Sequence, residues 1–268
     1  MTRSAAMVVL ALLLAFIVGP FVWVAWASLV PEARLFSSSV PLSFDVGAYR
    51  ALFVDRAFAV PLKNSLVVAA TTTTVCLAFG APAAYALARL RVRGARLVLG
   101  GVLAVSVLPQ ITIVGPLYLL LRAAGLIDST LGLVLPCTTF ALPLAIWLLT
   151  SQMRTLPPDL EEAARMDGAS RLRILVQIVL PLVAPAVATT AILVFVACWN
   201  ELLFALSFTV SPSRRTLPVA IALLRGQHQV PWREMLAAAV VTTAPVALLV
   251  LVFQRRIVGG LTAGGVKG

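Results

Sequence analysis

The chain has 268 residues, of which 61% are hydrophobic and only 12% are charged, and its mean hydropathy is +1.03. This composition lies outside the range of soluble globular proteins and indicates an integral membrane protein. The formal net charge of +11 is spread over short connectors and forms no basic block, so the charge does not indicate a nucleic-acid partner.

Six stretches are long and apolar enough to be membrane helices. A helix needs about 20 apolar residues to cross roughly 30 Å of hydrocarbon, and in lipid it satisfies its own backbone hydrogen bonds. The expected spans, in chain order, are about 7–30, 64–88, 97–121, 130–150, 183–206 and 235–254. We therefore expect an all-α membrane protein with a single transmembrane domain over residues 1–268.

The connectors between these spans predict how the chain crosses the membrane. Residues 31–63 have mixed charges and predict an external connector with some local structure, whereas the basic turn 89–96 is short enough to force an antiparallel pair. With a cytoplasmic N-terminus, 12 of the 21 Lys and Arg residues lie inside, which agrees with the positive-inside tendency. We expect both termini in the cytoplasm.

A charged segment at about 154–181 interrupts the apolar pattern. Pro157-Pro158 and the acidic residues that follow them are typical of a helix start. Gly168 suits the left-handed end of that helix, and Ser170 suits the cap of a second one. The segment therefore predicts a helix, a sharp bend and a second helix that runs into the fifth span.

The first of these two helices has a small apolar face. Leu160, Ala163 and Ala164 are expected to share it, and alanine allows another protein to approach closely. An alternative is an amphipathic helix lying on the inner leaflet, with neighbouring arginines on lipid phosphates. The short, alanine-rich face gains little from burial in lipid, which favours a protein partner.

Glu201 is the only acidic residue inside an expected span, and an ionisable side chain in a membrane indicates a function by default. With Trp199 and Asn200 it could line a translocation pathway. Alternatively, Trp199 anchors the helix at the interface and Glu201 reaches water or pairs with a connector arginine. The sequence does not decide between these two interpretations.

The chain has no motif that would supply its own chemical energy. A phosphate-binding loop requires Gly-x4-Gly-Lys-Ser/Thr, and neither Lys63 nor Lys267 stands in this pattern. The single His228 has no metal-binding companions, and no Gly-x-Ser-x-Gly elbow is present. We expect no catalytic residue, no metal site and no cofactor bound by this chain.

The charged segment resembles the EAA loop by which permease subunits of bacterial ABC importers engage their ATPase. Its spacing is Glu162-Ala163-Ala164, three residues, Gly168, nine residues, Ile178, one residue and Leu180-Pro181. Other segments resemble carbohydrate-uptake permeases, specifically the smaller six-helix partner of a maltose-type importer. These segments are 47–53, 63–69, 84–90, 116–120, 125–129, Trp199-Asn200-Glu201 and 260–268.

The resemblance implies the type I importer permease fold with a cytoplasmic coupling helix, in the bacterial cytoplasmic (inner) membrane. It also implies a heterodimer with a second permease subunit, two ATPase subunits that bind ATP and Mg, and an extracytoplasmic solute-binding protein that delivers a sugar or oligosaccharide. The tail at about 255–268 would contact the ATPase or remain a flexible end. The implied ATPase-coupling residues are Glu162, Ala163, Ala164, Asp167, Gly168, Ile178, Leu180 and Pro181.

Two other functions account for less of the sequence. An ion-coupled secondary transporter could use Glu201 as a proton or cation site without an ATPase, but the charged segment and the glycine-rich tail would have no role. A membrane scaffold explains the hydrophobicity and makes no use of the spacing in the charged segment.

Overall fold

The computed structural model describes residues 3–35, 44–90, 92–224 and 230–262, and all elements in this part of the chain are helical. The longer helices are α1 (Arg3–Ala27), α3 (Ala59–Arg89), α4 (Ala95–Val107), α5 (Gln110–Ala123), α6 (Thr130–Met153), α10 (Ala184–Trp199) and α13 (Trp232–Thr262). The shorter ones are η1 (Glu32–Arg34), α2 (Gly47–Arg50), η2 (Ala51–Asp55), α7 (Asp159–Met166), α8 (Arg171–Ile174), η3 (Leu175–Val179), α9 (Leu180–Leu182), α11 (Leu203–Phe208), η4 (Pro212–Arg214) and α12 (Leu217–Ala222). The expected all-α class is confirmed for the described residues.

Within the part of the chain that the structure describes, four helices are by themselves long and apolar enough to cross a membrane: α1, α3, α6 and the part of α13 up to Gln254. Two further spans are possible if each of two bent helix pairs counts as one. These pairs are α4 with α5, bent by 91°, and Arg171–Leu182 with α10, bent by 84°. The six expected spans are thus present in this sense, but two of them are not straight.

The third expected span, 97–121, is broken at its centre. Leu108 has extended backbone angles (φ −61°, ψ 134°), and Pro109 follows it with ψ 117°. A residue before proline is disfavoured in the helical conformation, and proline has no N–H to donate. The expectation of one continuous helix was wrong for this reason.

The fifth expected span, 183–206, is also interrupted. Helix α10 ends at Trp199, and α11 begins only at Leu203. The carboxylate of Glu201 accepts the backbone N–H groups of Phe204 (2.6 Å) and Ala205 (3.0 Å). An acidic side chain therefore caps the new helix inside an otherwise apolar run.

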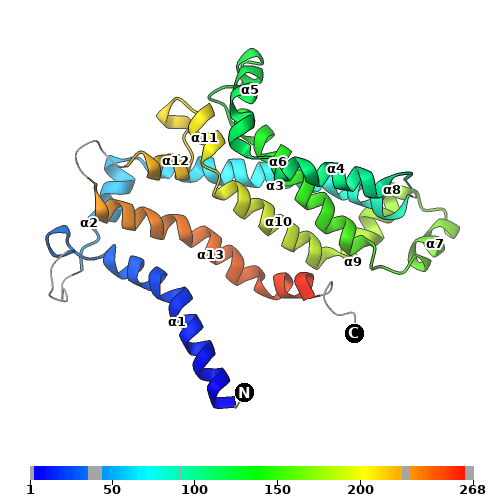
Figure 1. Ribbon diagram of the computed structural model, residues 1–268, viewed down its shortest axis with the longest axis horizontal. Coiled ribbons are helices and arrows are strands. Elements are labelled where there is room, and N and C mark those ends of the chain that lie inside the picture. Colours follow the sequence, from blue (N-terminus) through cyan, green and yellow to red (C-terminus); the bar gives the residue numbers. More distant parts are fainter. Residues whose placement is uncertain (1–2, 36–43, 91, 225–229, 263–268) are drawn as a thin grey trace.

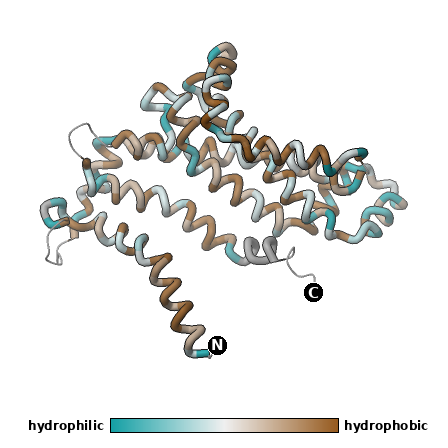
Figure 2. The backbone as a smooth tube through the Cα atoms, in the orientation of Figure 1, coloured by the Kyte–Doolittle hydropathy of each residue, from teal (hydrophilic) through white to brown (hydrophobic). Residues whose placement is uncertain are grey.

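Helices α3 and α6 lie side by side and form the most extensive contact, and α10 packs against α3, α6 and α13 (Figure 1). Helix α1 leaves this bundle and contacts α13, and Ala27 at its end is its only buried residue. Figure 2 shows that α1 is apolar along most of its length. Its side chains are therefore available to lipid or to another subunit.

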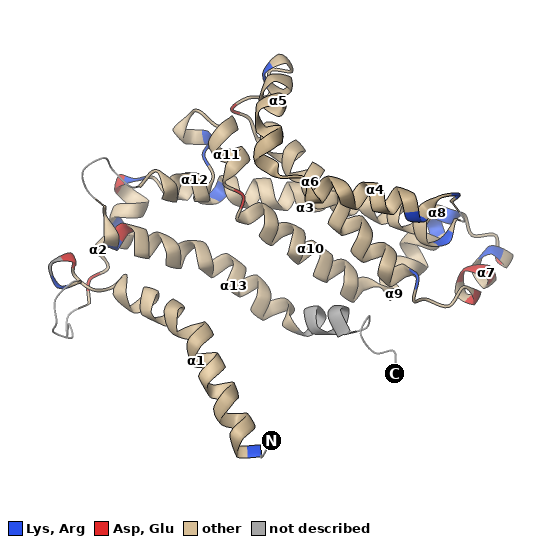
Figure 3. Ribbon diagram, viewed as in Figure 1, with Lys and Arg blue, Asp and Glu red and all other residues tan. Residues whose placement is uncertain are grey.

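Two groups of buried side chains hold the bundle together. One includes Leu52, Phe58, Trp199 and Phe204. The other lies near α7 and includes residues of the inner ends of α3 and α6. Charged residues gather toward the ends of the elongated molecule, and the long helices between them carry few (Figure 3). This separation agrees with a membrane protein whose charged ends are in water.

Candidate functional site

Helix α7 lies at the end of the molecule opposite α2 (Figure 1). It begins directly after Pro158, and its first turn contains Asp159, Glu161 and Glu162. Acidic residues in this position complement the positive end of the helix dipole. The predicted helix start is therefore confirmed.

The end of α7 has the hydrogen bonds of a Schellman motif. Gly168 has φ +78°; its N–H donates to the carbonyl of Arg165 (3.0 Å), and the N–H of Ala169 donates to the carbonyl of Ala164 (3.0 Å). The Ser170 hydroxyl then accepts the N–H of Arg173 (3.3 Å) at the start of α8. The predicted sequence of helix, bend and second helix is thus confirmed. The second helix does not continue straight into the fifth span, however, because Arg171–Leu182 and α10 are bent by 84° relative to each other.

The expected small face of α7 is divided between its two sides. Ala164 is buried among residues of α3, α6 and α8, whereas Leu160 and Ala163 are exposed. The expectation that the three form one docking face was wrong, because the bundle covers the Ala164 side. The exposed residues of α7 and its end instead include Leu160, Glu162, Ala163, Met166 and Asp167.

The buried side of α7 contains a charged residue, Glu161, that is not among the predicted site residues. Glu161 is 4% exposed, and its Oε1 lies 2.8 Å from Nε of Arg89, the last residue of α3. The hydroxyl of Tyr85 donates to Glu161 Oε2 (2.9 Å), and Arg89 Nη2 donates to the carbonyl of Leu156 (2.6 Å). We call Tyr85, Arg89 and Glu161 the Glu161 cluster.

One signal could have drawn attention to this cluster. Tyr85 and Arg89 are four residues apart at the inner end of a helix, so they lie on one face. A polar face there needs a polar partner if it is buried. Nothing in the sequence, however, points to Glu161 rather than to its neighbour Glu162.

The remaining residues of the predicted motif, Ile178, Leu180 and Pro181, lie in the segment that leads from α8 back to the helix bundle. Ile178 and Leu180 are half-buried against the core near α7, next to the buried Ile174 and Val179, whereas Pro181 is exposed. Together with the Glu161 cluster, these contacts attach α7 to the ends of α3 and α6. The helix is therefore held from its back, and its exposed face is left open.

A polar pocket of about 440 Å³ lies beside α7. It is lined by the paired residues Arg89 and Glu161 and also by Glu162, Arg165 and Arg171. The pocket thus continues the exposed face of α7 with charged groups of both signs.

The residues predicted near a pathway separate into different environments. Trp199 is 1% exposed, its Nε1 donates to the carbonyl of Thr242 (3.2 Å), and its ring stacks on Phe195 with centroids 5.6 Å apart. It packs inside the chain, between α10 and α13. Asn200 is exposed and Glu201 is half-buried at the helix break, so their roles in a pathway stay predictions.

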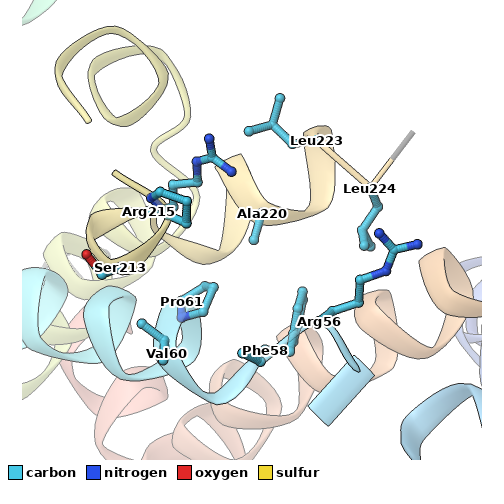
Figure 4. Close-up of a pocket in the computed structure, with 11 residues that line it drawn as sticks. Arg56, Phe58, Val60, Pro61, Ser213, Arg215, Ala220, Leu223 and Leu224 are labelled. Carbon is cyan, nitrogen blue, oxygen red and sulfur yellow. The ribbon is translucent and has the colours of Figure 1, made fainter. Parts of the chain in front are cut away.

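A second pocket, of about 350 Å³, lies at the opposite end of the molecule between the start of α3 and the segment η4–α12 (Figure 4). Arg56, Phe58, Pro61 and Arg215 are among its lining residues. Arg56 also pairs with Glu234 at 3.1 Å.

The predicted C-terminal tail lies partly outside the described residues: the backbone of 255–262 continues α13, and 263–268 are not described.

The family model described as "Binding-protein-dependent transport system inner membrane component" matches residues 76–262, which include α7 and the Glu161 cluster. The chain belongs to this family. It is 44% identical over 252 residues to the trehalose transport system permease protein SugB of Mycobacterium tuberculosis, covering 93% of this chain and 92% of the relative. It is 42% identical to the sulfoquinovosyl glycerol transport system permease protein SmoH of Agrobacterium fabrum, covering 93% and 88%.

The fold is also that of a solved transporter. A bacterial ABC transporter involved in the import of the acidic polysaccharide alginate matches with a TM-score of 0.76 and 24% identity, covering 95% of this chain and 98% of that chain. The chain is therefore a transmembrane permease subunit of a binding-protein-dependent ABC importer with the type I permease fold. The family match and the relatives do not favour the alternative function, an ion-coupled secondary transporter that uses Glu201.

Proposed function

We propose that this chain forms half of the pathway by which an importer carries a sugar or oligosaccharide, and that the exposed face of α7 docks on a partner ATPase that supplies ATP and Mg. The observation that carries the docking proposal is the two-sided character of α7. Its back is fixed by the Glu161 cluster, and Glu162, Ala163 and Asp167 face outward. Such a helix can be moved only together with α3.

The mechanism follows from this attachment. Closure of an ATPase pair on ATP displaces α7, and the ion pair between Glu161 and Arg89 passes the displacement to α3, which packs along α6. Packed helices transmit such motion as rigid bodies. The breaks at Leu108–Pro109 and at Glu201 are the points at which α5 and α11 can take a different angle.

The named relatives support a glycosidic cargo, because one is a trehalose and the other a sulfoquinovosyl glycerol permease. The partners are a second permease subunit, two ATPase subunits and an extracytoplasmic solute-binding protein. An even number of spans returns the chain to the side on which it starts, and the positive-inside tendency favours the cytoplasm for that side. Both termini and α7 are therefore proposed to be cytoplasmic. The whole chain acts as one transmembrane domain.

The test is co-purification of tagged protein from native membranes. Glu162→Lys changes the sign of an exposed charge, and Gly168→Pro cannot adopt the φ of +78° that ends α7. We expect the wild type to retain an ATPase and a second permease, and both variants to lose the ATPase. Glu32→Lys, which changes an exposed acid in the connector after α1, is the matched control and should behave as the wild type. Recovery of a lone protein or a homodimer would contradict the proposal.

A further inference from the structure

A small recess lies where both broken helices meet the bundle. It has a volume of about 120 Å³ and is lined by residues of α5, α6, α10 and α11 together with Glu201. Gln110, which lines it, is the first residue of α5 directly after the break at Pro109. In transporters, breaks in membrane helices often expose polar groups to the cargo.

The polar groups of the recess are well oriented. The Glu201 oxygens each accept one backbone N–H, from Phe204 and Ala205, so the carboxylate is fixed while each oxygen keeps a further acceptor position. Gln110 is exposed and adds a carboxamide that can both donate and accept. These groups fit a ligand that brings hydroxyl donors.

The negative charge of the Glu201 carboxylate further restricts the class of ligand that the recess can bind. No Lys, Arg or His is among the residues that line the recess in the described part of the chain. A carboxylate without a facing cation repels anions and attracts hydrogen-bond donors. The recess therefore suits a neutral polyol and opposes a carboxylate, sulfate or phosphate group.

The ring of Phe140 supplies aromatic surface on the apolar side of the recess. Phe140 of α6 is half-buried, and its ring centroid lies 5.5 Å from that of Phe204 of α11, which is fully buried. A pyranose has hydroxyl edges and apolar C–H faces, so it matches a pocket that combines aromatic walls with a few placed polar groups. The 120 Å³ volume corresponds to about four water molecules, which is room for one edge of a sugar ring.

We propose that this recess, between Glu201, Gln110 and Phe140, is a cargo contact that receives the hydroxyl-bearing edge of a neutral pyranose and disfavours acidic sugars. The inference rests on the proposed function and adds the charge class of the cargo and the part of this subunit that touches it. A contact of this size binds weakly, which suits a site that cargo must leave as well as enter.

The experiment uses the complete importer in proteoliposomes, with labelled trehalose, maltose and a glucuronic-acid disaccharide as import probes. The acidic disaccharide also serves, unlabelled, as a competitor of the neutral sugars. Removing a hydrogen bond to a charged group costs roughly tenfold or more in affinity. We expect Glu201→Gln to lower kcat/KM for the neutral sugar about tenfold and to increase inhibition by the acidic disaccharide. Glu32→Gln, which removes an exposed carboxylate elsewhere, should leave both quantities unchanged.

Two further variants separate a cargo contact from the capping role of Glu201. Gln110→Leu and Phe140→Leu leave the cap of α11 intact, so they decide the question if Glu201→Gln fails to assemble with the ATPase. Both should raise the KM for the neutral sugar.

Unchanged KM and unchanged inhibition in both variants, with an active wild type, would overturn the recess proposal alone. Import of the acidic disaccharide but of neither neutral sugar by the wild type would overturn the charge class. A wild type that imports none of the three and also co-purifies with no ATPase would contradict the proposed function itself.

Discussion

Nε of Arg89 lies 2.8 Å from Oε1 of Glu161, so an ion pair joins the end of α3 to the first turn of α7. The side chains are only 12% and 6% exposed. A buried ion pair is maintained only if further hydrogen bonds satisfy its members, and Tyr85 and the Leu156 carbonyl provide them. The position of α7 is thus set by α3 rather than by its own short sequence.

Removing one member of this pair should detach α7. Glu161→Ala leaves Arg89 buried and unpaired, which costs about 3–5 kcal/mol in comparable sites. We expect a lower unfolding temperature of the purified subunit in detergent and loss of co-purified ATPase. Arg165→Ala is the control, because Arg165 lies 3.8 Å from the same carboxylate with a side chain 49% exposed; its effect should stay within about 1 kcal/mol. Equal effects of the two variants would argue against the pair as the attachment of α7.

Gly168→Ala tests the turn after α7 without any steric clash. No atom lies within 4 Å of the position its Cβ would take, so the cost arises from the left-handed φ of +78° alone. That cost is about 1–2 kcal/mol for a non-glycine residue. We expect a small loss in unfolding temperature and weaker ATPase retention. Gly100→Ala in α4, which is equally unobstructed and has no positive φ, should be neutral or slightly stabilising. A loss in Gly100→Ala as large as in Gly168→Ala would refute the backbone argument.

Gly132→Ala should be far more damaging, for a steric reason. Its Cβ would lie 2.1 Å from the backbone oxygen of Leu126, which cannot move as a flexible side chain can. We expect a loss of about 3 kcal/mol or more in stability, measured as the unfolding temperature of the purified subunit. Gly101→Ala in α4, where no atom lies within 4 Å, provides the comparison. Normal stability of Gly132→Ala would show that the turn before α6 can rearrange.

Asp128 should give the connection between α5 and α6 an acid sensitivity. The Ser211 hydroxyl, the N–H groups of Val210 and Ser211 and the charge of Arg214, in this order of importance, lower the pKa of Asp128 below its ordinary value of 3.8. The unfolded chain binds this proton first, so the stabilisation is complete at pH 7 and is lost as the pH falls through the folded-state pKa.

The corresponding variant is Asp128→Asn. We expect its unfolding temperature to be below that of the wild type at pH 7, and the difference to shrink below about pH 4. Ser211→Ala should show part of the same behaviour, because it removes the largest contribution to the shift. A difference that is constant from pH 7 to pH 3 would mean that the Asp128 charge does not hold this loop.

Local signals in the sequence were sufficient for the elements whose boundaries are set by their own residues. Pro158, Gly168 and Ser170 fix the start and end of the α7–α8 turn through backbone geometry that neighbours alone determine. The break after Leu108 follows from Pro109 in the same way. The expected span 97–121 did not include this break, because proline is common in membrane helices and does not by itself mark the end of one.

Two kinds of side-chain contact, one long-range and one local, explain the failures. Glu161 is buried because Tyr85, 76 positions earlier, lies opposite it, and periodicity within α7 cannot reveal that partner. The reason at Glu201 is local instead: it ends one helix and caps another because its carboxylate accepts the N–H groups of Phe204 and Ala205, three and four residues further along the chain. The apolar residues on both sides of Glu201 predict a continuous helix. Hydrophobicity alone does not show that the Glu201 side chain takes the place of backbone carbonyls as hydrogen-bond acceptor.

Helix α1 has a consequence for how this subunit takes its final shape. Within the described residues, its long apolar surface is mostly exposed, and its main contact with its own chain is with α13. Between helices in lipid, close packing and not hydrophobicity sets the angle of contact. The tilt of α1 is therefore set by the subunit or helix that packs against it. The final position of α1, and with it the shape of this permease in the plane of the membrane, is fixed only when the complex assembles.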